Sequence, residues 1–458
     1  MNRSATPLGA ALDRLPRPEH LTIALFAYIS WVPFYYLRPL ELGASLPSFY
    51  LPKYLPLLLC LAISLLWVLR LWQGERPLPL TPALWGVPYL AFGLLSLVGA
   101  DYPLIGTGKW AYYHLTGILF GYIVAQHLRY WPAIERLASG IALVAGITAV
   151  YSLFGHLLGR DVLWGAVHQL NNPFHGGTWR LTAPFGNSVS TASYLALCLP
   201  FLVWKSAFAS HRPWSRWLFA ALSLVTAIDI LFTQSRGGWL ALGVGLLVAF
   251  LLLGAWAWRR EHPARRWVAL LILLLSLSVG GSLAYRADLH RLFAAQLEYM
   301  DHRASLLLGP RLEETEHYRL DQYRNVLELL RQHPFLGVGF GNFTRLYEQQ
   351  KTLRPEPERN SPVHTTDNMY LMFAAETGSL GLAAALALVG AVFWNVARAG
   401  AGPSGPSSGL ALAFLAGGLG FLVNMATWDP LNDPTLRITF WIMASTAVAA
   451  ARSVARGA

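Results

Sequence analysis

The chain has 458 residues, of which 55% are hydrophobic and only 13% are charged, and its formal net charge is +11. A soluble protein usually has about a quarter of its residues charged to cover its surface, so this composition excludes a soluble class. The basic balance does not indicate nucleic acid, because no soluble module carries a basic stripe interleaved with exposed aromatics. Cys60 and Cys198 both lie in apolar runs, which excludes a disulfide or zinc framework.

Apolar segments of about 20 residues, long enough to cross roughly 30 Å of hydrocarbon, follow one another along the chain. They predict an all-α, polytopic membrane protein with about 12 transmembrane helices in a single membrane domain over 1–458. We expect the first segment to be retained, because no small-residue cleavage site follows it. The predicted spans are 21–37, 51–72, 83–100, 110–128, 134–158, 190–208, 215–233, 237–257, 267–285, 368–398, 408–427 and 436–454.

A cytoplasmic N-terminus places more Lys and Arg in the inside segments than in the short outside segments, as the positive-inside rule requires. Both termini are then cytoplasmic, and two long segments, about 159–189 and about 286–363, lie outside. The second is an extracytoplasmic loop subdomain between spans nine and ten, with an amphipathic helix predicted over 317–333. Its expected apolar face consists of Leu320, Tyr323, Leu327 and Leu330. A site is expected on the side of a bundle that carries such a loop.

The turn Thr233–Gly238 joins two predicted spans on the outside and carries Arg236. An arginine between small residues at a helix junction is well placed to grip phosphate oxygens with parallel hydrogen bonds. Asp229 lies two helical turns earlier and is a candidate partner that orients Arg236. The alternative is an ordinary interfacial arginine that only reaches lipid headgroups.

Two further arginine motifs are predicted on the same face of the membrane. Arg180 precedes a turn marked by Phe185-Gly186-Asn187, which places it just above the bilayer. Arg319 and Arg324 lie on the predicted loop helix, which leads into the glycine-rich run 333–343. These glycines end the helix and permit a close approach to a ligand, but no strand precedes them and they are not a dinucleotide motif. Either motif is alternatively a plain loop feature without a ligand.

His364 and Asp367 stand just before the tenth predicted span. Asp367 is a natural N-cap for that helix, which is a purely structural role. Three residues apart, the two side chains are alternatively a proton acceptor and the group that orients it.

Over roughly residues 180–382, the sequence resembles the O-antigen ligase/polymerase superfamily of bacterial membrane glycosyltransferases. The resemblance depends on four motifs in this order, together with the twelve-span topology and the long loop before span ten. The motifs are Arg180 with Phe185-Gly186-Asn187, Ser235-Arg236-Gly237-Gly238, Arg319 with His333-Pro334 and Gly337-Val338-Gly339, and Asp367-Asn368 with Tyr370-Leu371, Glu376-Thr377-Gly378 and Gly381.

This resemblance implies transfer of a glycan from undecaprenyl diphosphate to a lipid-linked or glycan acceptor, on the outer face of the bacterial inner membrane. The leaving group is a diphosphate, and preorganised guanidinium groups would stabilise the charge that grows on it. No Asp-x-Asp motif occurs in the outside segments, so we expect metal-independent, inverting transfer without a cofactor. The residues implied in diphosphate binding are Arg180, Arg236, Arg319 and Arg324, with Arg236 and Arg319 also acting in catalysis.

The sequence departs from the family at the proton-handling position. Family members often carry a histidine directly before the asparagine, where this chain has Asp367, and the nearby histidine is His364. The proton-handling group is therefore His364, Asp367 or neither.

Three alternatives stay open. An O-antigen or exopolysaccharide polymerase of the same family differs from a ligase only in its acceptor, and twelve spans with one dominant loop favour the ligase with a lipid A core acceptor. A transporter or flippase of lipid-linked sugars needs polar residues at mid-depth, of which the sequence has few: Asp229, Glu376 and Asn424. A peptidoglycan polymerase of similar architecture is disfavoured, because its motifs have no match.

Overall fold

The structure, a computed structural model, describes residues 20, 22–24, 26, 51–72, 74, 76–78, 81–160, 180–182, 184–209, 213–258, 314–351, 366–402 and 405–457. Most of the predicted span 21–37, all of the span 267–285 and His364 lie outside these residues. The side chain of Arg319 also lies outside the described part, although its backbone is described.

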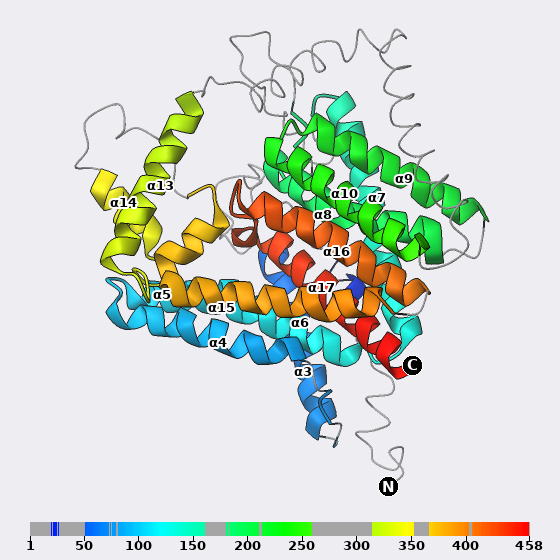
Figure 1. Cartoon of the computed structure of the whole chain (residues 1–458), viewed down its shortest axis with the longest axis horizontal. Helices are drawn as coiled ribbons and strands as arrows, with labels where there is room; N and C mark the ends of the chain where they lie inside the picture. Colours follow the sequence, from blue (N-terminus) through cyan, green and yellow to red (C-terminus); the bar gives the residue numbers. More distant parts are fainter. Residues whose placement is uncertain are drawn as a thin grey trace.

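The described elements are helices, with short 3₁₀ and π segments between some of them (Figure 1). Each predicted span within the described ranges has a helix at its position. The elements are α3 (Leu51–Trp72), α4 (Thr81–Leu95), η3 (Ser96–Gly99), α5 (Pro103–Trp110), η4 (Ala111–Leu115), α6 (Thr116–His127), α7 (Trp131–Leu157), α8 (Ser188–Trp204), η6 (Lys205–Ala209), α9 (Pro213–Phe232), α10 (Arg236–Trp258), α13 (Glu314–Gln332), α14 (Phe343–Lys351), α15 (Met369–Gly400), α16 (Pro406–Met425), η8 (Pro430–Asn432) and α17 (Pro434–Gly457).

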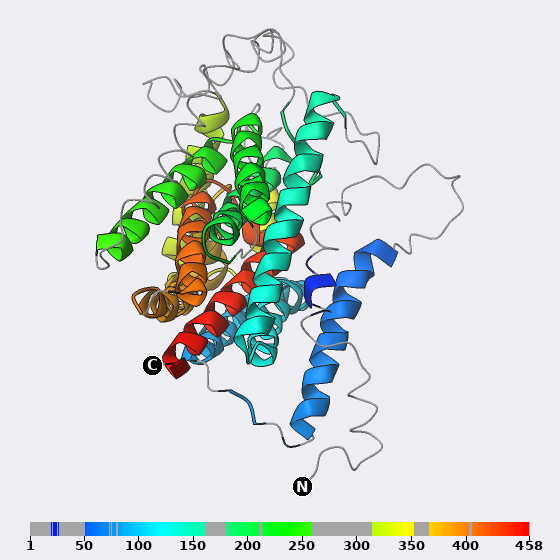
Figure 2. The same ribbon diagram turned by 90° about the vertical axis from the view of Figure 1, so that its right-hand side faces the viewer.

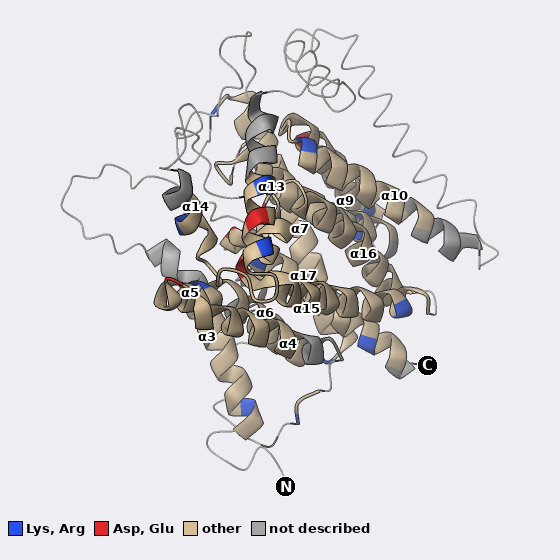
Figure 3. Ribbon diagram, turned by 60° about the vertical axis from the view of Figure 1, so that its left-hand side comes forward, with Lys and Arg blue, Asp and Glu red and all other residues tan. Residues whose placement is uncertain are grey.

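Six helices in the described part are long and apolar enough to cross a membrane, which makes the chain an integral membrane protein. Three further apolar helical segments are shorter: Leu58–Trp72 in α3, Gly86–Gly99 in α4 and η3, and Arg236–Ala249 in α10. The prediction of about 12 spans therefore remains a prediction. Figure 3 distinguishes the apolar spans from the polar loop helix. The long helices carry charged residues mainly towards their ends, whereas α13 carries them along its length.

The bundle is built around α15, α16 and α17, which pack against one another (Figure 1). On one side α16 contacts α8 and α10, and on the other α15 and α17 contact α4 and α6. α7 packs on α8 and α9, while α3 lies at one edge and contacts α6 (Figure 2). α13 and α14 lie beside the beginning of α15.

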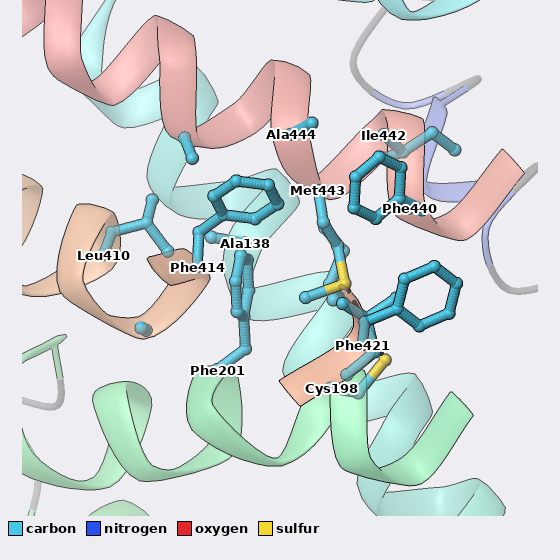
Figure 4. Packing of buried hydrophobic residues seen from close by; sticks show 14 of the residues in the cluster. Ala138, Cys198, Phe201, Leu410, Phe414, Phe421, Phe440, Ile442, Met443 and Ala444 are labelled. Atoms are coloured by element: carbon cyan, nitrogen blue, oxygen red, sulfur yellow. Dashed lines mark hydrogen bonds between the residues drawn. The ribbon is translucent and has the colours of Figure 1, made fainter. Parts of the chain in front are cut away.

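Aromatic and sulfur-containing side chains fill the core between α8, α16 and α17 (Figure 4). The rings of Phe421 and Phe440 stack with centroids 5.2 Å apart, and the sulfur atoms of Cys198 and Met443 are 3.9 Å apart. Cys198 is therefore a buried packing residue, as predicted.

Small residues let the helix backbones approach closely, as is usual where lipid supplies no hydrophobic force between helices. A Cβ at Gly417 would meet the carbonyl oxygen of Leu197 in α8, and one at Gly420 would meet the carbonyl oxygen of Ala241 in α10. These contacts hold α8, α10 and α16 together. At one end of the bundle, α9 meets α10 and α16 meets α17; we call this the junction end.

Candidate active site

Arg236 begins α10, directly after a tight turn from α9. Gln234 turns the chain with a φ of 53°, a left-handed conformation that is uncommon outside glycine. The hydroxyl of Ser235 accepts a hydrogen bond from the amide of Gly238 at 3.2 Å and so caps the first turn of α10. Because Gln234 and Ser235 are buried, the turn is rigid and fixes the backbone position of Arg236.

The two glycines after Arg236 pack the start of α10 against its neighbours. A Cβ at Gly237 would lie 2.6 Å from Oδ1 of Asn424, in the last turn of α16, and closer still to the hydroxyl of Thr427, just after that helix. A Cβ at Gly238 would lie 2.5 Å from the Cβ of Ala192 in α8. The glycines of this motif are therefore required for helix packing.

Asn424 joins three elements at the junction end. Its Nδ2 donates to the hydroxyl of Ser193 at 2.5 Å, and its Oδ1 accepts from the hydroxyl of Thr427 at 2.9 Å. The indole of Trp428 also donates to Ser193, at 3.1 Å. Asn424 is thus a buried structural group close to Arg236, rather than part of a polar path through the bundle.

Arg180 contacts the turn that precedes Arg236. Its Nε donates to the carbonyl oxygen of Thr233 at 3.1 Å, and one terminal nitrogen donates to that of Gln234 at 3.4 Å. The amide of Leu181 donates to the carbonyl oxygen of Phe232 at 3.1 Å. The structure therefore places Arg180 against the turn that leads into Arg236, and both arginines are only partly buried.

The turn after Arg180 has a structural explanation. Asn187 caps α8 by accepting a hydrogen bond from the amide of Val189 at 2.8 Å. Phe185 packs against Tyr194, with ring centroids 5.0 Å apart, and Gly186 has a φ of 63°. These three residues anchor the segment that carries Arg180.

Asp229 does not orient Arg236, and that expectation was wrong. Asp229 is fully buried within α9, and neither carboxyl oxygen has a hydrogen-bond partner in the described structure. The helix directs this side chain into the packing between spans rather than towards the turn.

The glycine-rich run after α13 clasps a break in α15. Gly378 has a φ of 67° and a ψ of −171°, which interrupts the helix. The amide of Val338 donates to the carbonyl oxygen of Ala375 at 2.9 Å, and that of Ser379 donates to the carbonyl oxygen of Pro334, also at 2.9 Å. A Cβ at Gly337 would meet the backbone of α15, 2.5 Å from the carbonyl oxygen of Ala375. These glycines serve backbone packing, which is a different role from the expected approach to a ligand.

The same run contacts the segment between α4 and α6. Lys109 donates from Nζ to the carbonyl oxygen of Gly341 at 3.0 Å, and Oδ1 of Asn342 accepts from the amide of Tyr102 at 2.9 Å. The amide of Phe340 donates to the hydroxyl of Ser96 at 3.1 Å. The loop before α15 is thereby fixed to two separate parts of the bundle.

The amphipathic loop helix is confirmed as α13, but its buried face differs from the predicted one. Val326 and Leu329 are buried, whereas Leu327 is 49% exposed. The expected face was placed about one residue out of register, because the contact with α15 selects the face and the sequence offers leucines on both sides. Arg324 is exposed.

The N-cap of α15 is Asn368 and not Asp367, which corrects the structural role expected of Asp367. Oδ1 of Asn368 accepts from the amides of Tyr370 and Leu371 at 3.1 and 3.2 Å. Asp367 instead has a φ of 45° and is partly exposed just before the cap. Its left-handed backbone is the kind of strained conformation that is often found at functional sites.

Ionisable side chains that sequence reasoning passed over are buried near Asp367. Asp429 and Asp433 lie between α16 and α17, and Arg437 lies in the first turn of α17. Arg437 donates to the carbonyl oxygen of Leu431 at 2.7 Å, and its guanidinium lies 4.6 Å from the ring centroid of Tyr113. The signal in the sequence is the presence of two aspartates and an arginine within residues 429–437, at the connection between two predicted spans.

Glu376 approaches this group from the broken part of α15. It is buried and interacts with Asp429, with Lys109 and with the backbone amides of Gly341 and Phe343. Its Oε1 has no hydrogen-bond partner in the part of the chain that the structure describes. Glu376, one of the few polar residues that the sequence offers at mid-depth, thus lies beside the loop that clasps α15.

The described residues contain no group of three or more His, Cys, Asp or Glu side chains that could hold a metal ion. No curated protein matches the chain. Residues 221–386, from α9 through the first half of α15, match the family model described as O-antigen ligase. This match covers Arg236, the loop with α13 and α14, and the segment from Asp367 to Gly378. The chain is therefore an integral membrane protein in which residues 221–386 form an O-antigen ligase family domain.

Proposed function

We propose that this protein transfers an oligo- or polysaccharide from undecaprenyl diphosphate to a lipid A core acceptor, on the periplasmic face of the bacterial inner membrane. The observation that carries the proposal is the pairing of Arg180 with the turn that presents Arg236. A guanidinium group from each side of this turn could donate to the same anion, and the opposite charges attract. A diphosphate offers several oxygens to such a pair.

In the reaction, the acceptor hydroxyl attacks the anomeric carbon as the bond to the diphosphate breaks, and the configuration inverts. Arg180 and Arg236 stabilise the charge that develops on the leaving diphosphate, in the place that a metal cation takes in other transferases. Losing one comparable preorganised donor raises a barrier by about 3 to 4 kcal/mol. Arg319 and Arg324 of α13 are proposed to complete the diphosphate site from the loop.

An apolar groove beside Arg236 supports a polyprenyl carrier. Residues of α8, α10 and α16 line an apolar groove, and its wall is rich in alanine and glycine, such as Ala196, Gly245 and Ala416. Ala241, also in this wall, lies five residues after Arg236 and so about 7 to 8 Å along the helix axis. If Arg236 holds the diphosphate of the carrier, the polyprenyl chain can extend along the groove that begins near Ala241.

The decisive experiment is an in vitro assay with purified protein in detergent and a carrier-linked glycan. We expect Arg236→Ala to lower the transfer rate by about 100-fold or more, in line with the loss of a preorganised donor. The matched control is Arg398→Ala, because Arg398 is exposed in the last turn of α15, away from the junction end. Transfer by Arg236→Ala at the parental rate would refute the diphosphate role.

The same assay separates the alternatives. A ligase uses a lipid A core acceptor, whereas a polymerase extends a second carrier-linked repeat with the same diphosphate site. A transporter or flippase makes no product in detergent, where it has no gradient. Activity retained with a chelator present would support metal-independent transfer.

The proton-handling group is tested by two variants. If His364 is the acceptor, His364→Ala loses activity and Asp367→Ala keeps it, and the reverse result shows that Asp367 accepts the proton or orients the group that does. Loss of activity in neither variant would direct attention to another residue near the start of α15.

The proposed orientation places both termini in the cytoplasm, following the excess of Lys and Arg in the segments assigned to that side. Reporter fusions at the two ends should both report the cytoplasm. A reporter inserted at 352–363 should report the periplasm, and the same side for all three would contradict the topology.

A further inference from the structure

Asp429 is a buried carboxyl group at the junction end. It follows α16 and precedes η8, and only 5% of its surface is exposed. Nδ2 of Asn432 donates to Oδ2 of Asp429 at 2.6 Å, which fixes one oxygen. Burial raises the pKa of Asp429 from 3.8 to about 6, with the neighbouring carboxylates of Asp367 and Asp433 contributing in the same direction.

Several elements direct charged groups towards Asp429. Asp367 reaches it from the segment before α15, and Glu376 from the broken part of α15. Asp433 lies four residues further along the chain, and Arg437 interacts with Asp433 from the first turn of α17. Asp429 itself lies beyond residue 386, outside the region that matches the family model. The fold therefore brings a carboxyl group from outside the family segment close to Asp367, the residue that stands where family members often carry a histidine.

The neighbouring carboxyl groups have other partners. Oδ1 of Asp433 caps α17 by accepting from the amides of Thr435 and Leu436 at 2.8 and 3.3 Å. Glu376 accepts hydrogen bonds from the backbone of the loop that clasps α15, at Gly341 and Phe343. Glu376 is only 3% exposed, and its Oε1 has no hydrogen-bond partner among the described residues. This buried acceptor is a second observation that indicates a ligand at this cluster. Asp429 differs from Asp433 and Glu376 because its carboxyl group neither caps a helix nor binds the backbone of the loop.

We propose that Asp429 is the base of the transfer reaction, with Asp367 orienting the acceptor hydroxyl at the partly exposed edge of the cluster. This inference rests on the proposed function. The acceptor oxygen forms its bond to the anomeric carbon, and the electron pair of the broken bond leaves on the diphosphate oxygen. The hydroxyl proton moves to Oδ1 of Asp429, because Oδ2 is held by Asn432.

The chemistry favours Asp429 because a base works best when its pKa lies near the working pH. An ordinary aspartate, with a pKa of about 3.9, holds a proton weakly at neutral pH. Burial moves Asp429 to about 6, close to the value of about 6.5 that an unperturbed histidine would bring.

The test is the dependence of kcat on pH, measured with purified full-length protein, carrier-linked glycan and a saturating acceptor. The parental enzyme should lose activity below an acid limb near pH 6, where Asp429 becomes protonated. Asp429→Asn should lower kcat about 100-fold or more and abolish this limb. Asn432→Ala removes the donor that favours the ionised carboxyl, so its limb should move to higher pH. Asp101→Asn, at an exposed position before α5, should leave the profile unchanged.

The outcomes separate a base from a structural residue. A purely structural Asp429 would lower kcat equally at every pH in Asp429→Asn and leave the limb in place, which overturns the proposal. Should Asp429→Asn fail to fold, an unshifted limb in Asn432→Ala overturns it equally. Should the parental protein make no product, the proposed function fails together with this inference. Parental transfer with an unaltered profile in both variants refutes the inference alone.

Discussion

Replacing Gly237 by alanine tests how helix packing positions Arg236. The added Cβ would lie 2.6 Å from Oδ1 of Asn424 and closer to the hydroxyl of Thr427, so α10 must move away from α16. Overpacking of this kind costs about 1 to 3 kcal/mol. The hydroxyl of Thr427, which lies closest to the new Cβ, must also turn away, and it then loses its hydrogen bond to Oδ1 of Asn424, with a net value of about 1 kcal/mol. We expect a total loss of about 2 to 4 kcal/mol.

The control is Gly243→Ala in the same helix, where a new Cβ meets nothing within 4 Å. That change should stabilise α10 by up to about 1 kcal/mol, because alanine favours the helix over glycine. Unfolding in detergent should therefore begin at a lower temperature in Gly237→Ala than in Gly243→Ala. Transfer should fall in the first variant only, because the displaced α10 carries Arg236 away from Arg180. Equal stability and activity of the two variants would refute the packing role of the motif.

Two further predictions concern α15 and the buried carboxyl. Gly378→Ala places a Cβ against the backbone of Phe335, at a residue whose φ is 67°. This variant should unfold at a clearly lower temperature than Gly390→Ala, where the new Cβ meets nothing within 4 Å. Equal melting temperatures would contradict the close packing of the glycine-rich run on α15. Because its folded pKa is raised to about 6, Asp429 is more easily protonated in the folded chain than in the unfolded chain, and its contribution to stability is lost as pH rises from about 4 through 6. Each unit of this shift corresponds to about 1.4 kcal/mol. Asp429→Asn should therefore show a weaker fall in melting temperature between pH 4.5 and 7 than the parental protein, and an identical fall in both would oppose a buried, titrating carboxyl.

The positions of the helices could be predicted from the sequence because hydrophobicity along a span is a local property. α9, for example, covers residues 213–232, against a prediction of 215–233. The grouping of Arg180 with Arg236 was expected only as a shared side of the membrane. The hydrogen bonds from Arg180 to Thr233 and Gln234 depend on how α8, α9 and α10 pack, which no local pattern contains.

The errors have the same origin. Asp367 and Asn368 are both good N-cap residues, and only the path of the chain into α15 selects Asn368. Asp229 lies close before Arg236 in the sequence, but a turn separates the two helices and Asp229 is fully buried in α9. Leucines on both sides of α13 left its buried face ambiguous until the contact with α15 selected one.

The sequence by itself determined that this is a many-helix membrane protein with arginine motifs typical of lipid-linked glycan transfer, because hydropathy and short motifs are written in consecutive residues. Only the tertiary structure decided that Asp429, Glu376 and Arg437 gather beside Asp367 at the junction end. Their burial, and hence the proton affinity of Asp429, depends on the helices that exclude water around them, and those helices come from distant parts of the chain.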